Sequence, residues 1–150
     1  MYNRTLRLLL VMAFAAVALV GLNSTAVADS EAEYTWVTDY DYRQNDGDKG
    51  GRSIREMVYS PGEGGYNHNK AVFQAHGETL HIGDFFENGH PTVVKLWVGG
   101  SGPAVYYAKG WGWSAYHLSY AEGQAVYMQV CTSDHPNAAC TSKTKYKGVT

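Results

Sequence analysis

Two histidines, His76 and His81, are the residues in this sequence whose types and spacing come nearest to a metal site. They flank Gly77 and Glu78 in "VFQAHGETLHIG", and a two-residue turn with glycine first is typical of a tight β-hairpin. The alternation of side chains along strands then places both histidines on one outward face, as diagonal neighbours. Zinc or copper needs at least one further ligand, which His68 or Glu78 could supply, although the spacing requires neither. The pair therefore predicts either a metal site or an ordinary polar sheet face.

Other catalytic chemistry has no recognisable motif in the chain. The nucleophile elbow glycine–X–serine–X–glycine is absent. The glycine-rich run "GGSGP" at 99–103 lacks the spacing of a phosphate-binding loop and is expected to form a turn. The carboxylates Asp84, Glu87 and Glu122 could serve in acid–base catalysis, but nothing in the sequence brings two of them together. These absences favour a non-catalytic protein without a cofactor. If the protein is an enzyme, its catalytic residues must come from distant parts of the sequence and meet only in the folded chain.

The first 28 residues predict a secretory signal peptide. Arg4 and Arg7 give a positively charged start, residues 8–20 are an uninterrupted apolar run, and "AVA" at 26–28 provides the small residues that signal peptidase needs. The apolar run is shorter than the roughly 20 residues of a membrane-spanning helix, so a permanent anchor is the weaker interpretation. We expect cleavage after Ala28 and an extracellular chain that leaves the membrane.

Charge and cysteine content fit an exported protein. The whole chain has a formal net charge of −2, and loss of Arg4 and Arg7 with the signal peptide changes it to −4. A mildly acidic chain without a concentrated basic patch is not expected to bind nucleic acid. The two cysteines, Cys131 and Cys140, both lie in the exported part, where oxidising conditions favour a disulfide. Such a bond would close the loop "CTSDHPNAAC".

The remaining chain divides into a polar segment, residues 29–51, and a β-rich domain, residues 52–150. The run "NDGDKGG" at 45–51 predicts a loop or flexible linker. From residue 52 onward, short segments rich in Val, Tyr, Phe and Trp are separated by Gly, Pro, Asn or Asp, and no helical period persists. Strands at this spacing predict an all-β domain, either a two-layer antiparallel β-sandwich of immunoglobulin-like type or a small barrel.

The hairpin around Gly77 has the clearest two faces. With the two-residue turn, His76 faces Thr79 and Phe73 faces Ile82. The apolar side chains of both strands then share one face and the polar ones share the other, so pattern and turn agree.

Alternation also assigns outward residues in the later strands. Trp97 and Tyr127 each lie between positions that are expected to be buried, so both side chains are expected to point outward. Near the C-terminus, Lys143, Lys145 and Lys147 occupy alternate positions. Lysines in this pattern are typical of an exposed edge strand, with a basic binding stripe as the alternative interpretation.

Three stretches of the chain occur in an order found in another group of proteins. "GETLHIGDFFENGHPTVVKLWV" is a strand, an Asn-Gly-His turn and a strand, and "AYHLSYAEGQAVYMQVCT" is a strand, a Glu-Gly turn and a strand that ends in cysteine. The closing cysteine and a short final strand follow. Over about residues 54–149 the chain resembles the small secreted β-sandwich proteins of actinobacteria, whose function is uncharacterised. The resemblance implies an exported, disulfide-pinned sandwich and carries over no catalytic residue. Asn88 stands where those proteins often have Asp, and both residues suit a turn.

The stretch "KGWGWSAYHLSY" contains two tryptophans, Trp111 and Trp113. Strict alternation places both indoles on one face, and the glycines around them suit a bend better than a central strand. The indoles could join Trp97 and Tyr127 in an exposed aromatic patch, which is typical of an interaction surface. The alternative is that residues 29–51 fold back over the rings, because "YTWVTDY" within them could add a strand.

Three functions are compatible with these features. The first is a secreted, non-catalytic protein whose aromatic patch and disulfide-pinned loop bind an extracellular protein or a polysaccharide surface. The second is a small inhibitor of secreted hydrolases, in which the tethered loop 132–139 enters an enzyme cleft. Asp134, His135 and the central Pro136 are the candidate binding residues of this loop. The third is a metal-assisted hydrolase that uses His76 and His81. No pattern in the sequence indicates the oligomeric state.

Overall fold

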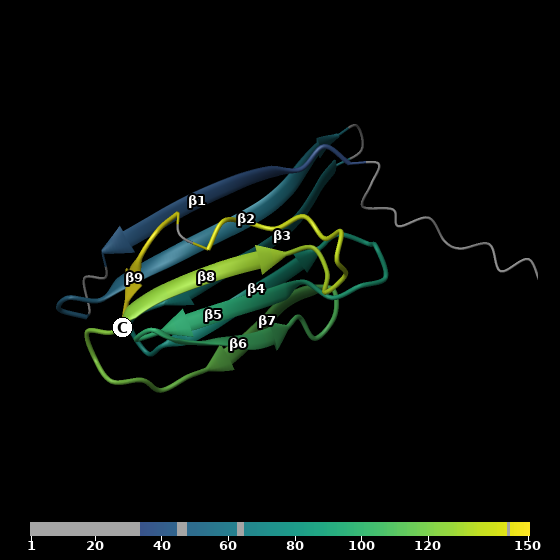
Figure 1. The fold of residues 1–150 in the computed structure, drawn as a ribbon. Coiled ribbons are helices and arrows are strands. Elements are labelled where there is room, and N and C mark those ends of the chain that lie inside the picture. Colours follow the sequence, from purple (N-terminus) through teal and green to yellow (C-terminus); the bar gives the residue numbers. More distant parts are fainter. Residues whose placement is uncertain (1–33, 45–47, 63–64, 144) are drawn as a thin grey trace, which may run out of the picture.

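The computed structural model describes residues 34–44, 48–62, 65–143 and 145–150. The predicted signal peptide and its cleavage site lie outside these ranges. Within them the regular secondary structure is β-strand and there is no helix, which confirms the all-β class. The strands are β1 (Val37–Gln44), β2 (Arg52–Gly62), β3 (Gly65–Gln74), β4 (Thr79–Phe85), β5 (Val93–Val98), β6 (Ser101–Tyr107), β7 (Gly112–His117), β8 (Ala125–Cys131) and β9 (Gly148–Val149) (Figure 1).

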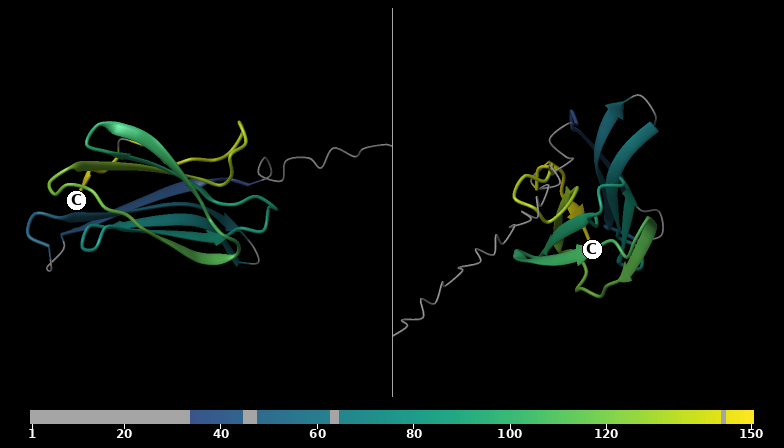
Figure 2. Two further views of the ribbon diagram at one scale, coloured as in Figure 1. Left: turned by 90° about the horizontal axis from the view of Figure 1, so that it is seen from below. Right: turned by 90° about the vertical axis from the view of Figure 1, so that its right-hand side faces the viewer.

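The strands pair antiparallel throughout and form one continuous sheet. Their order is β6–β5–β8–β9–β2–β3–β4–β7, and β1 pairs with β2 off this path. The sheet curls into a half-barrel, so that its two halves face each other across the interior (Figure 2). β6 and β7 are the two ends of the strand order, and each has a neighbouring strand on one side only.

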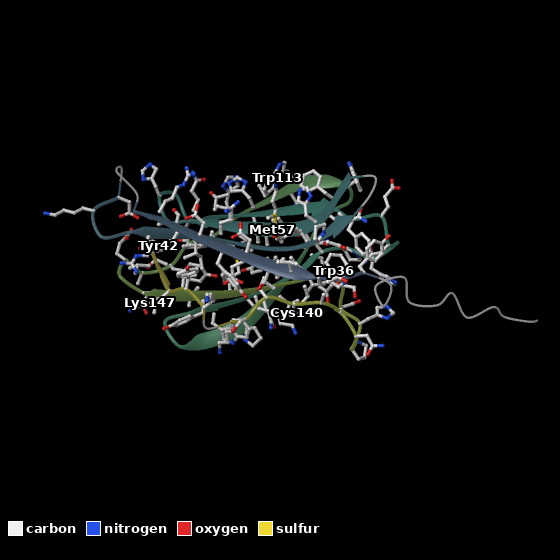
Figure 3. The ribbon with its side chains drawn as sticks, turned by 90° about the horizontal axis from the view of Figure 1, so that it is seen from above. Trp36, Tyr42, Met57, Trp113, Cys140 and Lys147 are labelled. Atoms are coloured by element: carbon white, nitrogen blue, oxygen red, sulfur yellow. A yellow bond between two sulfur atoms is a disulfide. The ribbon has the colours of Figure 1, made fainter. Side chains whose placement is uncertain are left out.

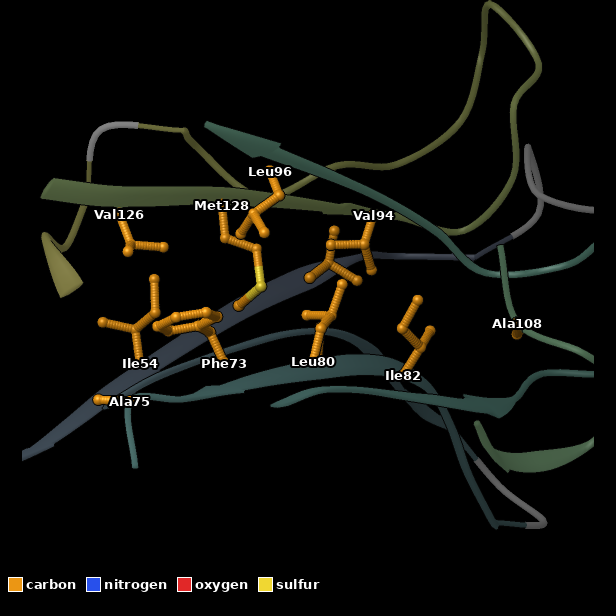
Figure 4. Close-up of a cluster of buried hydrophobic side chains, with 12 residues drawn as sticks. Ile54, Phe73, Ala75, Leu80, Ile82, Val94, Leu96, Ala108, Val126 and Met128 are labelled. Carbon is orange, nitrogen blue, oxygen red and sulfur yellow. The ribbon is translucent and has the colours of Figure 1, made fainter. Parts of the chain in front are cut away.

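The core lies inside the curl. It contains fully buried apolar side chains of β2, β3, β4, β5 and β8: Ile54, Phe73, Leu80, Ile82, Val94, Leu96, Val126 and Met128. The side chains of β5 and β8 point toward those of β2, β3 and β4 (Figure 4). They occupy alternate positions because successive side chains of a strand point to opposite faces. Burial of each such side chain contributes about 1.5–3 kcal/mol, so this cluster holds the two halves of the sheet together.

The β3–β4 hairpin has a longer turn than the sequence predicts. Residues 75–78 form a four-residue turn, and Phe73 faces Leu80 instead of Ile82. His76 therefore lies in the turn and not on the strand face. The register differs from the expected one by two residues, which is a full period of side-chain alternation. The predicted inward set is consequently confirmed, whereas the predicted pairing is wrong. Of the predicted outward set, Gln74 is exposed and His81 is half-buried, but Thr79 is buried and His76 lies in the turn.

The conformation of Glu78 accounts for the longer turn. Gly77 and Glu78 both have positive φ, 76° and 44°. Left-handed backbone at a non-glycine residue costs about 1–3 kcal/mol. The segment that follows β7 offsets this cost, because Leu118 N donates to the Glu78 carbonyl (2.9 Å) and Tyr120 N donates to Glu78 Oε2 (2.6 Å). Both partners are distant in the sequence, so local turn preferences do not reveal them.

The polar N-terminal segment, residues 29–51, contributes the strand β1. β1 pairs with β2 along its whole length. Just before β1, the rings of Tyr34 and Trp36 pack against Phe86 with centroid distances of 5.1 and 5.0 Å. The described part of this segment therefore extends the sheet beside β2 and does not lie over β7.

The alternate lysines near the C-terminus do not form an edge strand, which corrects that expectation. The final strand β9 is only Gly148–Val149, and it lies inside the strand order between β8 and β2. The segment before β9 crosses from β8 toward β1. There, Lys143 Nζ lies 4.1 Å from the centre of the Trp97 ring and Lys145 Nζ lies 5.8 Å from the centre of the Tyr40 ring.

Candidate functional site

β7, at one end of the strand order, and the residue just before it present two exposed tryptophans. Trp111 is 66% exposed and Trp113 is 52% exposed, whereas the next residue, Ser114, is buried. This alternation is the one that the sequence predicts. Gly110 and Gly112 have φ of 129° and 95°, values that other residues rarely adopt, so these glycines allow the chain to turn into β7. β7 thus directs Trp113 outward, and the turn that leads into β7 does the same for Trp111.

The two indoles pack around Phe85 of β4. Its ring centroid lies 5.9 Å from that of Trp111 and 5.8 Å from that of Trp113, with interplanar angles of 78° and 81°. Edge-to-face contacts of this kind contribute about 0.5–1.5 kcal/mol each and orient the rings. His68 of β3 stacks on Phe85 at 4.6 Å. We call these four rings with the two polar side chains described next the aromatic face: His68, Lys70, His81, Phe85, Trp111 and Trp113.

A glycine provides the space for this cluster. Gly83 of β4 pairs with Lys70 on β3 and with Trp113 on β7. A β-carbon at Gly83 would lie 2.7 Å from a ring carbon of Phe85, 3.1 Å from Lys70 Cγ and 3.2 Å from a ring carbon of Trp113. Without it, Lys70 Nζ lies 4.8 Å from the centre of Trp113 and 5.1 Å from that of Phe85. The negative ring faces attract the ammonium group.

A shallow hollow beside Trp113 adds hydrogen-bonding groups to the aromatic face. It is lined by Val72, Gln74, His81 and Trp113. His81 Nε2 lies 3.3 Å from Gln74 Oε1, and the imidazole meets the Trp113 ring edge-on with a centroid distance of 6.5 Å. The site thus combines open ring surface with an amide and an imidazole at its border.

Trp97 and Tyr127 lie elsewhere, which corrects the expectation that they join the β7 tryptophans in one patch. They face each other across β5 and β8, which β9, β2 and β3 separate from β4 and β7 in the strand order. Trp97 is half-buried, and Lys143 Nζ lies over its ring. Trp113 and Cys140, which is close in sequence to Lys143, lie on opposite sides of β1 (Figure 3). The aromatic face and Trp97 are therefore two separate tryptophan regions, and the fourth tryptophan, Trp36, packs against Phe86.

The predicted disulfide between Cys131 and Cys140 is present, with an S–S distance of 2.07 Å. It closes the loop at the end of β8. The loop ends are also joined by two hydrogen bonds, from Thr132 N to the Ala139 carbonyl (3.0 Å) and from Ala139 N to Thr132 Oγ1 (3.1 Å). The bond and these contacts fix the base of the loop.

The tip of this loop presents the three residues that the sequence singled out. Asp134, His135 and Pro136 are exposed. The His135 ring lies 4.3 Å from that of His90, between centroids. The tip is thus in contact with the β4–β5 connection, whose His90 lines a hollow together with Trp111 of the aromatic face.

His76 and His81 are not brought together as metal ligands. The longer turn moves His76 off the strand face into a hollow that Glu78 and Glu122 also line, while His81 lies on β4 beside Trp113. Throughout the described ranges, no three or more His, Cys, Asp or Glu residues form a group that could hold a metal ion. The expected histidine pair therefore does not form.

Glu56 of β2 is a fully buried carboxyl group under the C-terminal segment. Its Oε2 accepts a hydrogen bond from Thr141 Oγ1, which itself accepts one from Val130 N (2.8 Å). Glu56 Oε1 has no hydrogen-bond partner among the described residues. Burial raises the pKa of Glu56 to about 8, and the Thr141 bond opposes this shift. The group has no solvent access, so it bears on stability and not on binding.

Sequence reasoning missed three residues of the site: Lys70, Gly83 and Phe85. The signal for Phe85 was present, because it lies four residues after His81 on the same strand and so on the same face. No local signal indicates that β4 pairs with β7, and only this pairing brings Phe85 and Gly83 beside Trp113.

Comparison with known proteins gives no relative: no protein-family model, no curated protein and no solved structure matches this chain. The described residues include no helix with the length and apolar character needed to cross a membrane. Function is therefore inferred from the geometry and chemistry of the aromatic face.

Proposed function

We propose that this protein is secreted and binds polysaccharide, without catalysis, through the aromatic face. The observation that carries this proposal is the exposure of Trp111 and Trp113, both oriented by contact with Phe85. Apolar surface in water costs about 25 cal/mol per Å², and a sugar ring stacked on the indoles would cover part of it. Rings that are already oriented lose little conformational entropy when a ligand binds.

The mixture of groups favours a sugar over a purely apolar partner. A pyranose ring has apolar C–H faces and hydroxyl groups around its rim. The indole of Trp113 can stack on such a face, while Gln74 and His81 at the border of the hollow can exchange hydrogen bonds with hydroxyls. A protein surface is the alternative extracellular partner, and the experiment below separates the two.

Secretion is inferred from the N-terminal pattern, with cleavage after Ala28. The Cys131–Cys140 disulfide supports it, because disulfides persist in oxidising compartments. We also propose that the curled sheet belongs to the two-layer β-sandwich architecture, in which β5 and β8 form one layer and β2, β3 and β4 form the other. The side chains that face each other across the core support this description (Figure 4).

A pull-down on insoluble polysaccharides tests the binding proposal. Protein expressed from the full chain is incubated with cellulose, chitin, xylan and isolated cell walls, and the bound fraction is measured. We expect retention on at least one matrix and its loss in the double variant Trp111→Ala/Trp113→Ala. Each exposed indole is expected to contribute about 2 kcal/mol, so the double variant should bind roughly a thousandfold more weakly.

The matched control is Trp97→Ala, which removes an indole from the other tryptophan region and should keep binding within about twofold. Equal loss in Trp97→Ala and in the double variant, or no retention on any matrix, would contradict the proposal. Retention only on cell walls from which protein has not been stripped would assign the surface to a protein partner.

Inhibition of a secreted hydrolase is the second candidate function. The observation that favours it is the exposed tip Asp134–Pro136, on a loop whose base is fixed by a disulfide and hydrogen bonds. A fixed loop enters a cleft at low entropic cost. Loss of protease or amylase activity on addition of the protein, abolished by His135→Ala/Pro136→Ala, would support this function.

A further inference from the structure

Among the described residues, the acidic and basic side chains on the outer face of β1 and β2 form ion pairs. Asp39 lies 3.0 Å from the Arg55 guanidinium, and Asp41 lies 4.0 Å from the same group and 3.9 Å from that of Arg43. Lys70 of the neighbouring strand β3 is the remaining lysine or arginine among the described residues of this face. Among the described residues, no carboxylate lies within salt-bridge distance of its ammonium group.

The surroundings of Lys70 make its positive charge costly. The side chain is half-buried between the rings of Phe85 and Trp113. Burial and the nearby positive charge of Arg55 both lower the pKa of Lys70. A carboxylate that approached from solvent would offset both effects, because it would supply the opposite charge and a charge-assisted hydrogen bond.

We propose that Lys70 makes the aromatic face selective for acidic polysaccharides, by pairing with the carboxylate of a uronic acid unit that stacks on Trp113. This proposal rests on the proposed function. Lys70 Nζ lies 4.8 Å from the centre of the Trp113 ring, so a carboxylate attached to a sugar on that indole would be within reach of the ammonium. Gly83 maintains this arrangement, because any β-carbon there would displace Lys70 and both rings.

Matched pairs of polymers test the selectivity. Binding of protein expressed from the full chain is measured by calorimetry for polygalacturonate and its methyl ester, and for hyaluronate and its methyl ester. Each pair has the same backbone, and only the first member has the charge. We expect about tenfold tighter binding of the charged member at low salt, reduced when the NaCl concentration is raised from about 50 to 500 mM, because salt screens the pair.

The variant Lys70→Gln is expected to bring the ratio between the affinities for the charged and the esterified polymer close to one. Lys49→Gln, which removes the same charge from an exposed turn, is the matched control and should keep the ratio. Equal melting temperatures of the two variants would show that the fold is intact.

The outcomes separate this proposal from the one it rests on. Binding of charged and esterified polymers with equal affinity would overturn the role of Lys70 and leave polysaccharide binding in place. Acid selectivity that survives Lys70→Gln but is lost in Lys143→Gln would assign it to the Trp97 region and also overturn the proposal. Failure of the protein to bind any polymer or any insoluble matrix would overturn both.

Discussion

Trp113 of β7 and Trp97 of β5 both point outward from their strands and differ in what covers them. Trp113 points outward from its strand and is 52% exposed, and Trp111 just before that strand is 66% exposed. Trp97 also points outward, yet it is half-buried. β5 has neighbours on both sides, β6 and β8, and the C-terminal segment places Lys143 over the indole. β7 has one neighbour, β4.

This difference shows that alternation decides the direction of a side chain, whereas neighbouring elements decide its exposure. A lysine is near indole in both regions, but with different consequences. Lys143 lies directly over Trp97 at 4.1 Å, whereas Lys70 lies between Phe85 and Trp113 on a face that remains open. One region has a covered indole and the other has ring surface available to a ligand.

The segment that covers Trp97 is attached to the sheet in part by Glu56, which accepts a hydrogen bond from Thr141, two residues before Lys143. The largest effect that we expect is the pH dependence of stability that Glu56 causes. Its pKa is raised to about 8 in the folded protein, so its contribution to stability is fully present below about pH 4.5 and is lost as the pH rises through about 8. We expect the free energy of unfolding to fall by about 3 kcal/mol between about pH 5.5 and 7.5. Urea unfolding followed by Trp fluorescence measures this slope.

Glu56→Gln is the control for the pH effect, because it keeps the shape of the side chain without the titrating proton. The variant should lose most of the slope over that range. A slope that is unchanged in Glu56→Gln would assign the pH dependence to other groups.

Removal of the disulfide tests whether binding at the aromatic face is independent of the stability of the loop at the end of β8. Removal of the crosslink in Cys131→Ala/Cys140→Ala should lower the free energy of unfolding by about 2–3 kcal/mol, because the loop gains entropy in the unfolded chain. The aromatic face lies on β3, β4 and β7, so polysaccharide binding should stay within about twofold. Loss of binding in a variant that is still folded would show that the regions are coupled.

Gly83→Ala tests the arrangement of the aromatic face directly. The added β-carbon would lie 2.7 Å from a Phe85 ring carbon, so Phe85 must move. We expect binding of the polysaccharide to weaken about fivefold, which corresponds to about 1 kcal/mol. In the matched control Gly62→Ala, no heavy atom lies within 4 Å of the added carbon, and binding should not change. Equal binding by both variants would show that the ring positions do not matter.

Lys143→Ala is expected to have the smallest effect. The variant removes the ammonium over Trp97 at a cost of about 0.5–1 kcal/mol in stability, typical of an exposed cation–π pair. It should increase the quenching of Trp97 by acrylamide, measured in a Trp36→Phe/Trp111→Phe/Trp113→Phe background, in which Trp97 is the remaining tryptophan. Lys147→Ala, an exposed lysine of the same segment, should leave quenching unchanged. No increase in Lys143→Ala would show that other groups cover the indole.

Much of the fold could be predicted because its signal is local. The alternation along β7 placed Trp111 and Trp113 on one outward face, and the burial of Ser114 agrees with it. The inward face of the hairpin was also predicted correctly, whereas its register was not. The register depends on Glu78, which accepts hydrogen bonds from Leu118 N and Tyr120 N beyond β7. Partners so distant in the sequence cannot be predicted from the residues of the turn.

The amino-acid sequence by itself determined the all-β class, the direction of the β7 tryptophans and the disulfide, because strand alternation and a pair of cysteines are local or compositional properties. Only the tertiary structure decided that Phe85, Lys70 and Gly83 meet Trp113, and that Trp97 lies apart. The pairing of β4 with β7 brings these residues together. Pairing between distant strands depends on how the whole sheet closes around its core, and no short stretch of sequence contains that information.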